Sequence, residues 1–104
     1  MRILRDYEGL AIRLTDERLA HILEHPEMAD LEPAIEETLL KPEQVTESFS
    51  DQTAKLYYRF YVTTMVGGKY LCVVVKTVDA DAFVLTAYLT DKVKRGKSIW
   101  PKDA

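Results

Sequence analysis

The feature that most constrains the fold is a pair of long strand-forming segments separated by two adjacent glycines. Residues 55–66 and 70–78 are rich in aromatic and β-branched side chains, which favour extended backbone, and Gly67 and Gly68 lie between them. Both central positions of a tight hairpin turn can require positive φ, which glycine adopts without strain. The two segments are therefore predicted to pair as antiparallel strands.

Shorter strand-like segments flank this hairpin, and two helical segments precede it. Apolar side chains recur at helical spacing within residues 15–41. The first helix should end near His25, because Pro26 disfavours helical dihedrals in the residue before it. The second is expected over roughly 30–40. Segregated helices and strands indicate the α+β class.

The expected architecture is two N-terminal helices followed by a four-stranded antiparallel β-meander, with one or two short strands before the helices. A chain of 104 residues is long enough for one domain with one core. We expect short strands in residues 1–14, helices in 15–41, an antiparallel sheet in 44–90 and a basic tail in 91–104.

Composition excludes several classes of protein. No apolar stretch approaches the roughly 20 residues of a membrane span. The first six residues include charges where a signal peptide needs an apolar run, so we expect a cytoplasmic protein without membrane association. Cys72 is the one cysteine, which excludes an internal disulfide and a cysteine-built zinc site. Nothing in the sequence calls for a cofactor.

The charges are unevenly distributed along the chain. Residues 16–51 carry eleven acidic and two basic side chains, whereas residues 52–104 carry nine basic and four acidic ones. Such asymmetry can indicate an anionic partner for the basic half of a protein. The alternative is that the acidic segment forms solvated helix faces and that the lysines protect strand edges.

Alternation along the predicted strands separates two faces of the sheet. The nearly apolar set is expected to form the core face: Leu56, Tyr58, Phe60, Val62, Leu71, Val73, Val75, Phe83, Leu85, Ala87 and Leu89. The other set mixes hydroxyl, aromatic and basic side chains: Tyr57, Arg59, Tyr61, Thr63, Tyr70, Cys72, Val74, Lys76, Val84, Thr86, Tyr88 and Thr90. Such a face suits RNA, since aromatic rings stack on bases and cations meet phosphates. It also suits the wet face of any antiparallel sheet.

The two histidines, His21 and His25, are four residues apart on the first predicted helix and so share one side of it. Histidine transfers protons readily near neutral pH, and His25 at the helix C-terminus is a candidate general acid or base. The structural alternatives are a half-buried His21 bonded to backbone and a His25 that merely caps the helix. With Glu17, the pair could also be a zinc site, although no third histidine supports it.

Basic residues follow the last predicted strand directly. That strand carries Thr86 and Tyr88, and the next segment includes Lys92 and Lys94. Hydroxyls beside a run of cations can bind a phosphodiester backbone. A solvated, charged chain end is the alternative interpretation.

Several short motifs, taken in order, resemble one family of ribonucleases. They are His21-Ile22-Leu23-Glu24-His25-Pro26-Glu27-Met28, Ile35-x-x-Thr38-Leu39-x-x-Pro42-x-x-Val45, Tyr70-Leu71-x-Val73-Val74-Val75, Val84-x-Thr86-Ala87-Tyr88 and Lys94-x-Gly96. This ordered set, across about residues 15–97, resembles the phage-associated branch of the Barnase–EndoU–colicin D–RelE-like ribonucleases.

The resemblance implies a metal-independent, toxin-like endoribonuclease, with RNA as substrate and a small antitoxin protein as partner. It implies catalytic roles for His25, with His21 beside it, and for Thr86 and Tyr88. It implies that Arg59, Lys92 and Lys94 hold the phosphate. Tyr61, on the same predicted face as Arg59, is a further candidate for binding the substrate. The competing hypotheses are a non-catalytic module that binds RNA or a protein, and a metal-dependent hydrolase.

Overall fold

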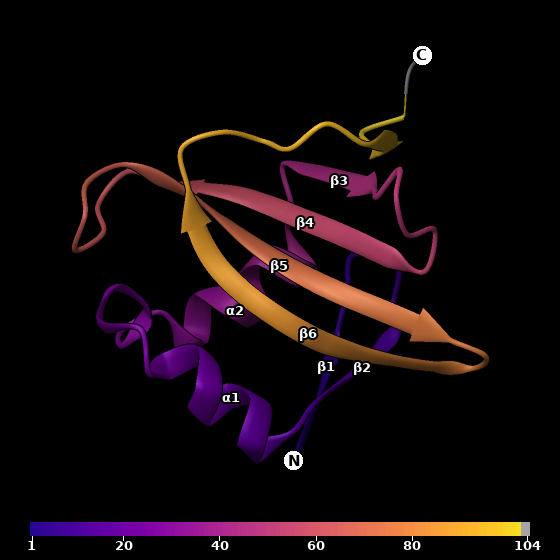
Figure 1. Ribbon diagram of the computed structural model, residues 1–104, viewed down its shortest axis with the longest axis horizontal. Helices are drawn as coiled ribbons and strands as arrows, with labels where there is room; N and C mark the ends of the chain where they lie inside the picture. The colour runs from indigo at the N-terminus through magenta and orange to yellow at the C-terminus, as the bar shows by residue number, and fades with distance from the viewer. Residues whose placement is uncertain (103–104) are drawn as a thin grey trace.

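The computed structural model describes residues 1–102, which form two short α-helices, one 3-10 turn and seven strands (Figure 1). In chain order the elements are β1 (Arg2–Arg5), β2 (Ala11–Leu14), α1 (Asp16–Leu23), η1 (Pro26–Met28), α2 (Glu32–Leu40), β3 (Gln44–Glu47), β4 (Ala54–Tyr61), β5 (Lys69–Val78), β6 (Asp81–Thr90) and β7 (Lys97–Trp100). The strands form one sheet in the order β1-β2-β6-β5-β4-β3-β7. Both α-helices cover the same face of that sheet (Figure 1).

The prediction of two helices followed by a four-stranded antiparallel meander was wrong. The sheet has seven strands and is mixed, because β2 lies parallel to β6 while the other neighbours are antiparallel. Short strands were expected in residues 1–14 and occur as β1 and β2, but the prediction did not join them to the main sheet, and it missed β7 at the other end of the chain. Such pairing depends on long-range contacts and leaves little local signal.

The N-terminal hairpin of β1 and β2 joins the sheet through a single pair of residues, Arg13 opposite Phe83. Arg13 also donates two hydrogen bonds to the Asp81 carboxylate, at 2.9 and 2.6 Å, in the bidentate geometry that suits a guanidinium. The remainder of β6 has no strand partner on the β2 side. A charged pair 68 residues apart thus fixes the hairpin beside β6.

The C-terminal segment, predicted as a basic tail, instead continues the sheet. Residues 97–100 form β7 against β3. Residues 91–96, which we call the strap, run from the end of β6 to β7 across the top of the sheet as drawn in Figure 1. Gly96 permits this close approach, since a Cβ there would lie 2.7 Å from the Glu47 carbonyl oxygen. Residues 103–104 of the predicted tail lie outside the described residues.

The predicted faces of β4 were interchanged. Tyr57 is fully buried with the helix-facing core, which also contains Ile22, Ile35 and Val73. Leu56 lies on the opposite face, in a smaller apolar cluster. Alternation alone places the phenol of Tyr57 in the polar set, but its hydroxyl is satisfied inside the core by Asp6 at 2.7 Å.

Helix boundaries and the central turn also differ in detail from the predictions. The helix expected to reach His25 ends at Leu23, and the second helix begins at Glu32 rather than near residue 30. The predicted two-residue turn is a longer loop over residues 62–68, in which Gly67 has a φ of +90°. Within residues 1–102, no helix has the length and apolar character needed to cross a lipid bilayer.

Candidate nucleic-acid interface

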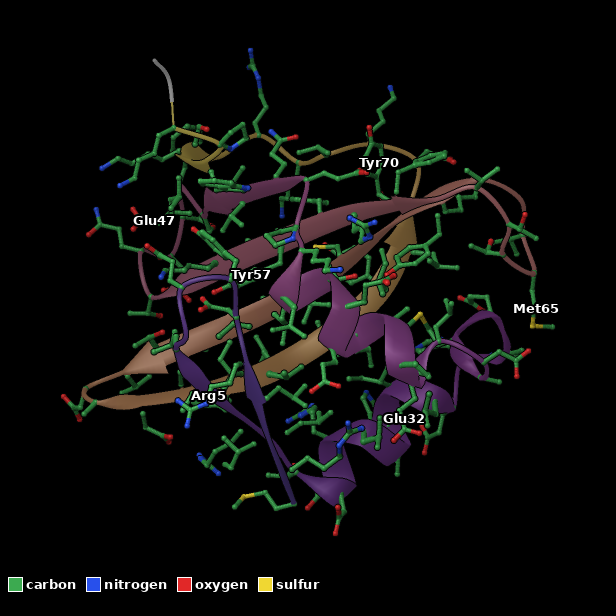
Figure 2. All side chains as sticks on the ribbon, turned by 180° about the vertical axis from the view of Figure 1, so that it is seen from behind. Arg5, Glu32, Glu47, Tyr57, Met65 and Tyr70 are labelled. Atoms are coloured by element: carbon green, nitrogen blue, oxygen red, sulfur yellow. The ribbon has the colours of Figure 1, made fainter. Side chains whose placement is uncertain are left out.

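The face of the sheet turned away from α1 and α2 carries hydroxyl, aromatic and apolar side chains from three adjacent strands. We call it the open face and define it by Leu56, Tyr58, Phe60, Tyr70, Cys72, Val74, Thr86 and Tyr88. The pairing register aligns them in successive rows across β4, β5 and β6. Figure 2 shows Tyr70 near the C-terminal segment, on the side of the molecule away from Glu32 of α2.

The central row consists of Tyr58, Cys72 and Tyr88. Burial raises the pKa of Tyr58 to about 12 and that of the Cys72 thiol to about 11. Burial also raises the pKa of Tyr88, which is 37% exposed, and the neighbouring Cys72 adds to the shift. All three groups are therefore protonated and uncharged near neutral pH. They can donate hydrogen bonds, but they add no negative charge that would repel an anion.

The strap crosses the open face beside this row. The backbone N–H of Lys94 donates to the Tyr58 hydroxyl at 3.1 Å, and Val93 packs on the apolar cluster beneath. These two contacts fix the strap where its cationic side chains border the sheet. The hydroxyl of Tyr58 thus organises the backbone of the segment that carries Lys94 and Arg95.

A pocket of about 230 Å³ lies between the strap and the sheet. Its lining comes from the loop after β3, from β4, β5 and β6, and from the strap. These residues are Ser48, Ala54, Leu56, Val74, Leu85, Thr86, Tyr88, Lys94 and Arg95. Within residues 1–102, neither Lys94 nor Arg95 has a carboxylate within ion-pairing distance. Two cations and three hydroxyls without a carboxylate suit an anionic group such as a phosphate.

A larger hollow, of about 410 Å³, lies between the η1 region and the loop that follows β4. Its lining residues are Glu27, Asp30, Leu31, Thr63, Thr64 and Met65. The two carboxylates and the absence of a cation from this lining disfavour a phosphate ligand. The smaller pocket on the open face is therefore the better candidate for contact with RNA.

Some of the predicted site residues come together at this pocket. Thr86, Tyr88 and Lys94 all line it. Lys92 is exposed on the strap, where its backbone N–H and carbonyl both contact the Thr90 hydroxyl. Thr86, Tyr88 and Lys94 thus remain together as candidates for contact with substrate, while Lys92 lies outside the pocket lining.

Arg59 and Tyr61 lie on the helix-facing side of β4, away from that pocket. The Arg59 guanidinium donates to the Lys41 carbonyl at 2.8 Å and lies 3.6 Å from a Glu37 carboxylate oxygen. The Tyr61 hydroxyl donates to Glu37 at 2.7 Å. Both side chains attach β4 to α2, so the structure does not bring them to the same phosphodiester as Thr86 and Tyr88.

The two histidines also lie apart from the open-face pocket. α1 packs on the other face of the sheet through Ile22, and His21 and His25 are exposed. The Nδ1 atom of His21 is 3.6 Å from a carboxylate oxygen of Glu24. The backbone carbonyl of His25 accepts a hydrogen bond from the Met28 backbone N–H at 2.9 Å. Within residues 1–102, no hydrogen bond joins either imidazole to the pocket residues. Nor do His, Cys, Asp and Glu side chains there gather into a group that could hold a metal ion.

The sequence did not predict a role at this site for Arg95 and Ser48, which line the pocket, or for Tyr58, which lies beside it under the strap. Arg95 is next to Lys94 in the basic run, so the charge pattern could have indicated it. Tyr58 was assigned to the core, and only its contact with the strap reveals its role. Ser48 belongs to a loop that carries no distinctive signal.

No protein-family model, curated protein or solved structure matches this chain.

Proposed function

We propose that the chain is a metal-independent endoribonuclease that holds the RNA backbone on its open face. The observation that carries the proposal is the pocket that Lys94 and Arg95 line together with Thr86 and Tyr88. The similarity of the ordered motifs to toxin-like ribonucleases supports the same function. Phe60, at 41% exposed, and Tyr70 extend this face with aromatic surface on which bases can stack.

The chemistry follows from what a phosphodiester needs during cleavage by its own 2′-hydroxyl. The 2′-OH loses its proton to water, its oxygen bonds to phosphorus, and the bond from phosphorus to the 5′-oxygen breaks. The departing 5′-oxygen takes a proton back from solvent water, which balances the proton released by the 2′-OH, and a 2′,3′-cyclic phosphate remains. Lys94 and Arg95 stabilise the negative charge that accumulates on the phosphoryl oxygens, because fixed cations act where charge develops. Thr86 and Tyr88 orient the phosphate by donating hydrogen bonds.

The test is cleavage and binding of a labelled single-stranded RNA in EDTA by the wild type and by a Lys94→Ala/Arg95→Ala variant. The variant should bind more weakly and cleave more slowly. Loss of two phosphate contacts should also reduce the slope of log affinity against log salt by about 1.4. Lys97→Ala is the control, since Lys97 is an exposed cation at the start of β7, directly after the strap, and lies outside the pocket. Equal effects of the two changes would contradict the proposal.

The resemblance assigns proton transfer to His25, and a His25→Ala variant separates that role from the open-face arrangement. Cleavage that persists in His25→Ala and fails in the Lys94→Ala/Arg95→Ala variant supports the site described above. The reverse result would place the reaction at the helix side of the molecule instead.

A non-catalytic RNA-binding module is the second candidate. It is favoured by the chemistry of the pocket, because Tyr88 in its lining and the adjacent Tyr58 are held protonated and no imidazole lines the pocket. Salt-dependent binding that requires Lys94 and Arg95, without any cleavage product, would identify this function.

A toxin-like ribonuclease would act on cytoplasmic RNA and be held in check by a small antitoxin protein. Expression of the wild type should then arrest growth, and the Lys94→Ala/Arg95→Ala variant should be tolerated at equal protein levels. Tolerance of the wild type would favour the binding module.

A further inference from the structure

The floor of the open-face pocket is apolar, unlike its rim. Ala54, Leu56, Val74 and Leu85, which come from the sheet, supply the apolar floor, whereas Lys94 and Arg95 come from the strap and Ser48, Thr86 and Tyr88 add hydroxyls to the lining. Cations and hydroxyls account for the phosphate of an RNA chain, but they do not account for an apolar surface beneath. A ligand group that complements this floor is flat or compact, with a largely apolar face that packs on it.

A β-bulge adds Leu85 to this floor. Val74 pairs with Thr86 and Val75 pairs with Val84, so Leu85 is an extra residue in β6 without a partner on β5. Consecutive residues of a regular strand point to opposite faces, yet Leu85 and Thr86 both line the pocket. The bulge thus places an apolar side chain beside a hydroxyl in the same pocket, which a regular strand could not do.

We propose that this floor binds one unpaired nucleobase of the RNA whose phosphate lies beside Lys94 and Arg95. This inference rests on the proposed function and specifies its substrate as single-stranded RNA with one base turned out of the stack. A base in a duplex is paired and stacked, whereas single strands can present individual bases to a protein. The apolar floor would cover the face of the base, and the hydroxyl of Ser48, which the phosphate does not use, would bond to its edge.

The size and charge of the pocket agree with this occupant. At about 230 Å³ the pocket is smaller than the roughly 300–1,000 Å³ of sites for drug-sized ligands, so it suits one base rather than two stacked ones. Lys94 and Arg95, which lack carboxylate partners within residues 1–102, complement the phosphate that a base must bring with it. A neutral apolar peptide side chain would leave these cations without a counter-charge.

The first experiment needs no variant of the protein. The affinity of the wild type for a short single-stranded RNA is compared with its affinity for the same strand carrying abasic sites at successive positions, and for the duplex. One abasic position should weaken binding by about ten-fold, the effect expected from burying one face of a base. The duplex should bind at least as weakly as that abasic strand.

The second experiment fills the floor with an Ala54→Leu variant. This variant should lose about ten-fold in affinity for the intact strand but bind the abasic strand as the wild type does. Ala11→Leu, at an exposed position of β2, is the matched control and should leave both affinities unchanged. Circular dichroism verifies that both variants are folded.

The possible failures are distinguishable. Equal affinity of the wild type for intact and abasic strands, with the dependence on Lys94 and Arg95 retained, overturns the base-binding inference alone. Equal affinity for duplex and single strand does the same. RNA binding that is absent, or insensitive to Lys94→Ala/Arg95→Ala, overturns the proposed function and this inference with it.

Discussion

The buried contact between Asp6 and Tyr57 should be one of the strongest single determinants of stability. Asp6 is 3% exposed and accepts hydrogen bonds from the Tyr57 hydroxyl at 2.7 Å and from the backbone N–H groups of Glu8 and Leu10 at 2.9 Å each. Burial and the adjacent carboxylate raise the pKa of Tyr57, so its phenol stays protonated and donates. Figure 2 shows Tyr57 in the middle of the molecule, near the hairpin of β1 and β2.

Replacement of Asp6 by alanine removes all three contacts and leaves a buried phenol without an acceptor. A buried group left unsatisfied costs about 1–3 kcal/mol, and hydrogen bonds to a charged group contribute about 1.5–3 kcal/mol each. Allowing for partial access of water to the turn, we expect Asp6→Ala to lower the free energy of unfolding by about 3 kcal/mol. Tyr57→Phe, which removes one of the three bonds, should cost about 1.5 kcal/mol.

Urea and thermal unfolding followed by circular dichroism measure these changes. A loss of about 3 kcal/mol corresponds to a fall in Tm of roughly 15 °C in a domain of this size. The double variant should be no less stable than Asp6→Ala alone, giving a coupling of about 1.5 kcal/mol between the two side chains. Glu8→Ala, in the same turn but exposed, is the control. A loss below about 1 kcal/mol for Asp6→Ala, or additive single effects, would refute the reasoning.

Two further changes test the contacts that hold the terminal strands to the sheet. Gly96→Ala places a Cβ 2.7 Å from the Glu47 carbonyl oxygen, so it should lower the free energy of unfolding by about 1–3 kcal/mol. It should also alter the fluorescence of Trp100, the single tryptophan, because β7 must shift. Unchanged unfolding and emission would show that the strap tolerates a side chain. The hydrogen bond and charge of Arg13 lower the pKa of Asp81 in the folded protein. The Arg13–Asp81 pair therefore stabilises the fold above the unfolded pKa of Asp81, near 3.8, and this stabilisation is lost as pH falls through the lower folded pKa. Asp81→Asn should flatten the pH dependence of stability below about pH 4, and parallel stability profiles for variant and wild type would contradict this role of the pair.

The central strands could be recognised from the sequence because their signal is local. The strand-forming segment at 70–78 occurs in the sheet as β5, and its Leu71, Val73 and Val75 belong to the helix-facing core. β-branched residues crowd a helix but pack well on a pleated sheet, so a run of them identifies a strand without knowledge of its neighbours. The start of α1 is also set locally, because the Thr15 hydroxyl accepts a hydrogen bond from the Arg18 backbone N–H.

The face of β4 could not be assigned in this way. Leu56 and Tyr57 differ little in their ability to fill a core once the phenol hydroxyl has a partner, and that partner is Asp6, 51 residues away. Because the faces of β4 were interchanged, Arg59 and Tyr61 were predicted on the same face as Thr86, whereas they lie on the helix-facing side of the sheet. A polar side chain that is satisfied inside the core defeats a pattern based on polarity alone.

The candidate site depends partly on local sequence and partly on contacts between distant residues. Thr86, Tyr88 and Lys94 belong to one short stretch of sequence, so their residue types alone made them candidates. Their convergence on one pocket depends on the path of the strap, which pairs β7 with β3 and places the Lys94 backbone N–H on the Tyr58 hydroxyl. The bulge at Leu85 is likewise a matter of register between β5 and β6. Local side-chain preference thus established most of the strands and helices. The edges of the sheet, the buried face of β4 and the open-face pocket depend on contacts between residues far apart in the chain. No short segment of sequence contains the free energy of such contacts.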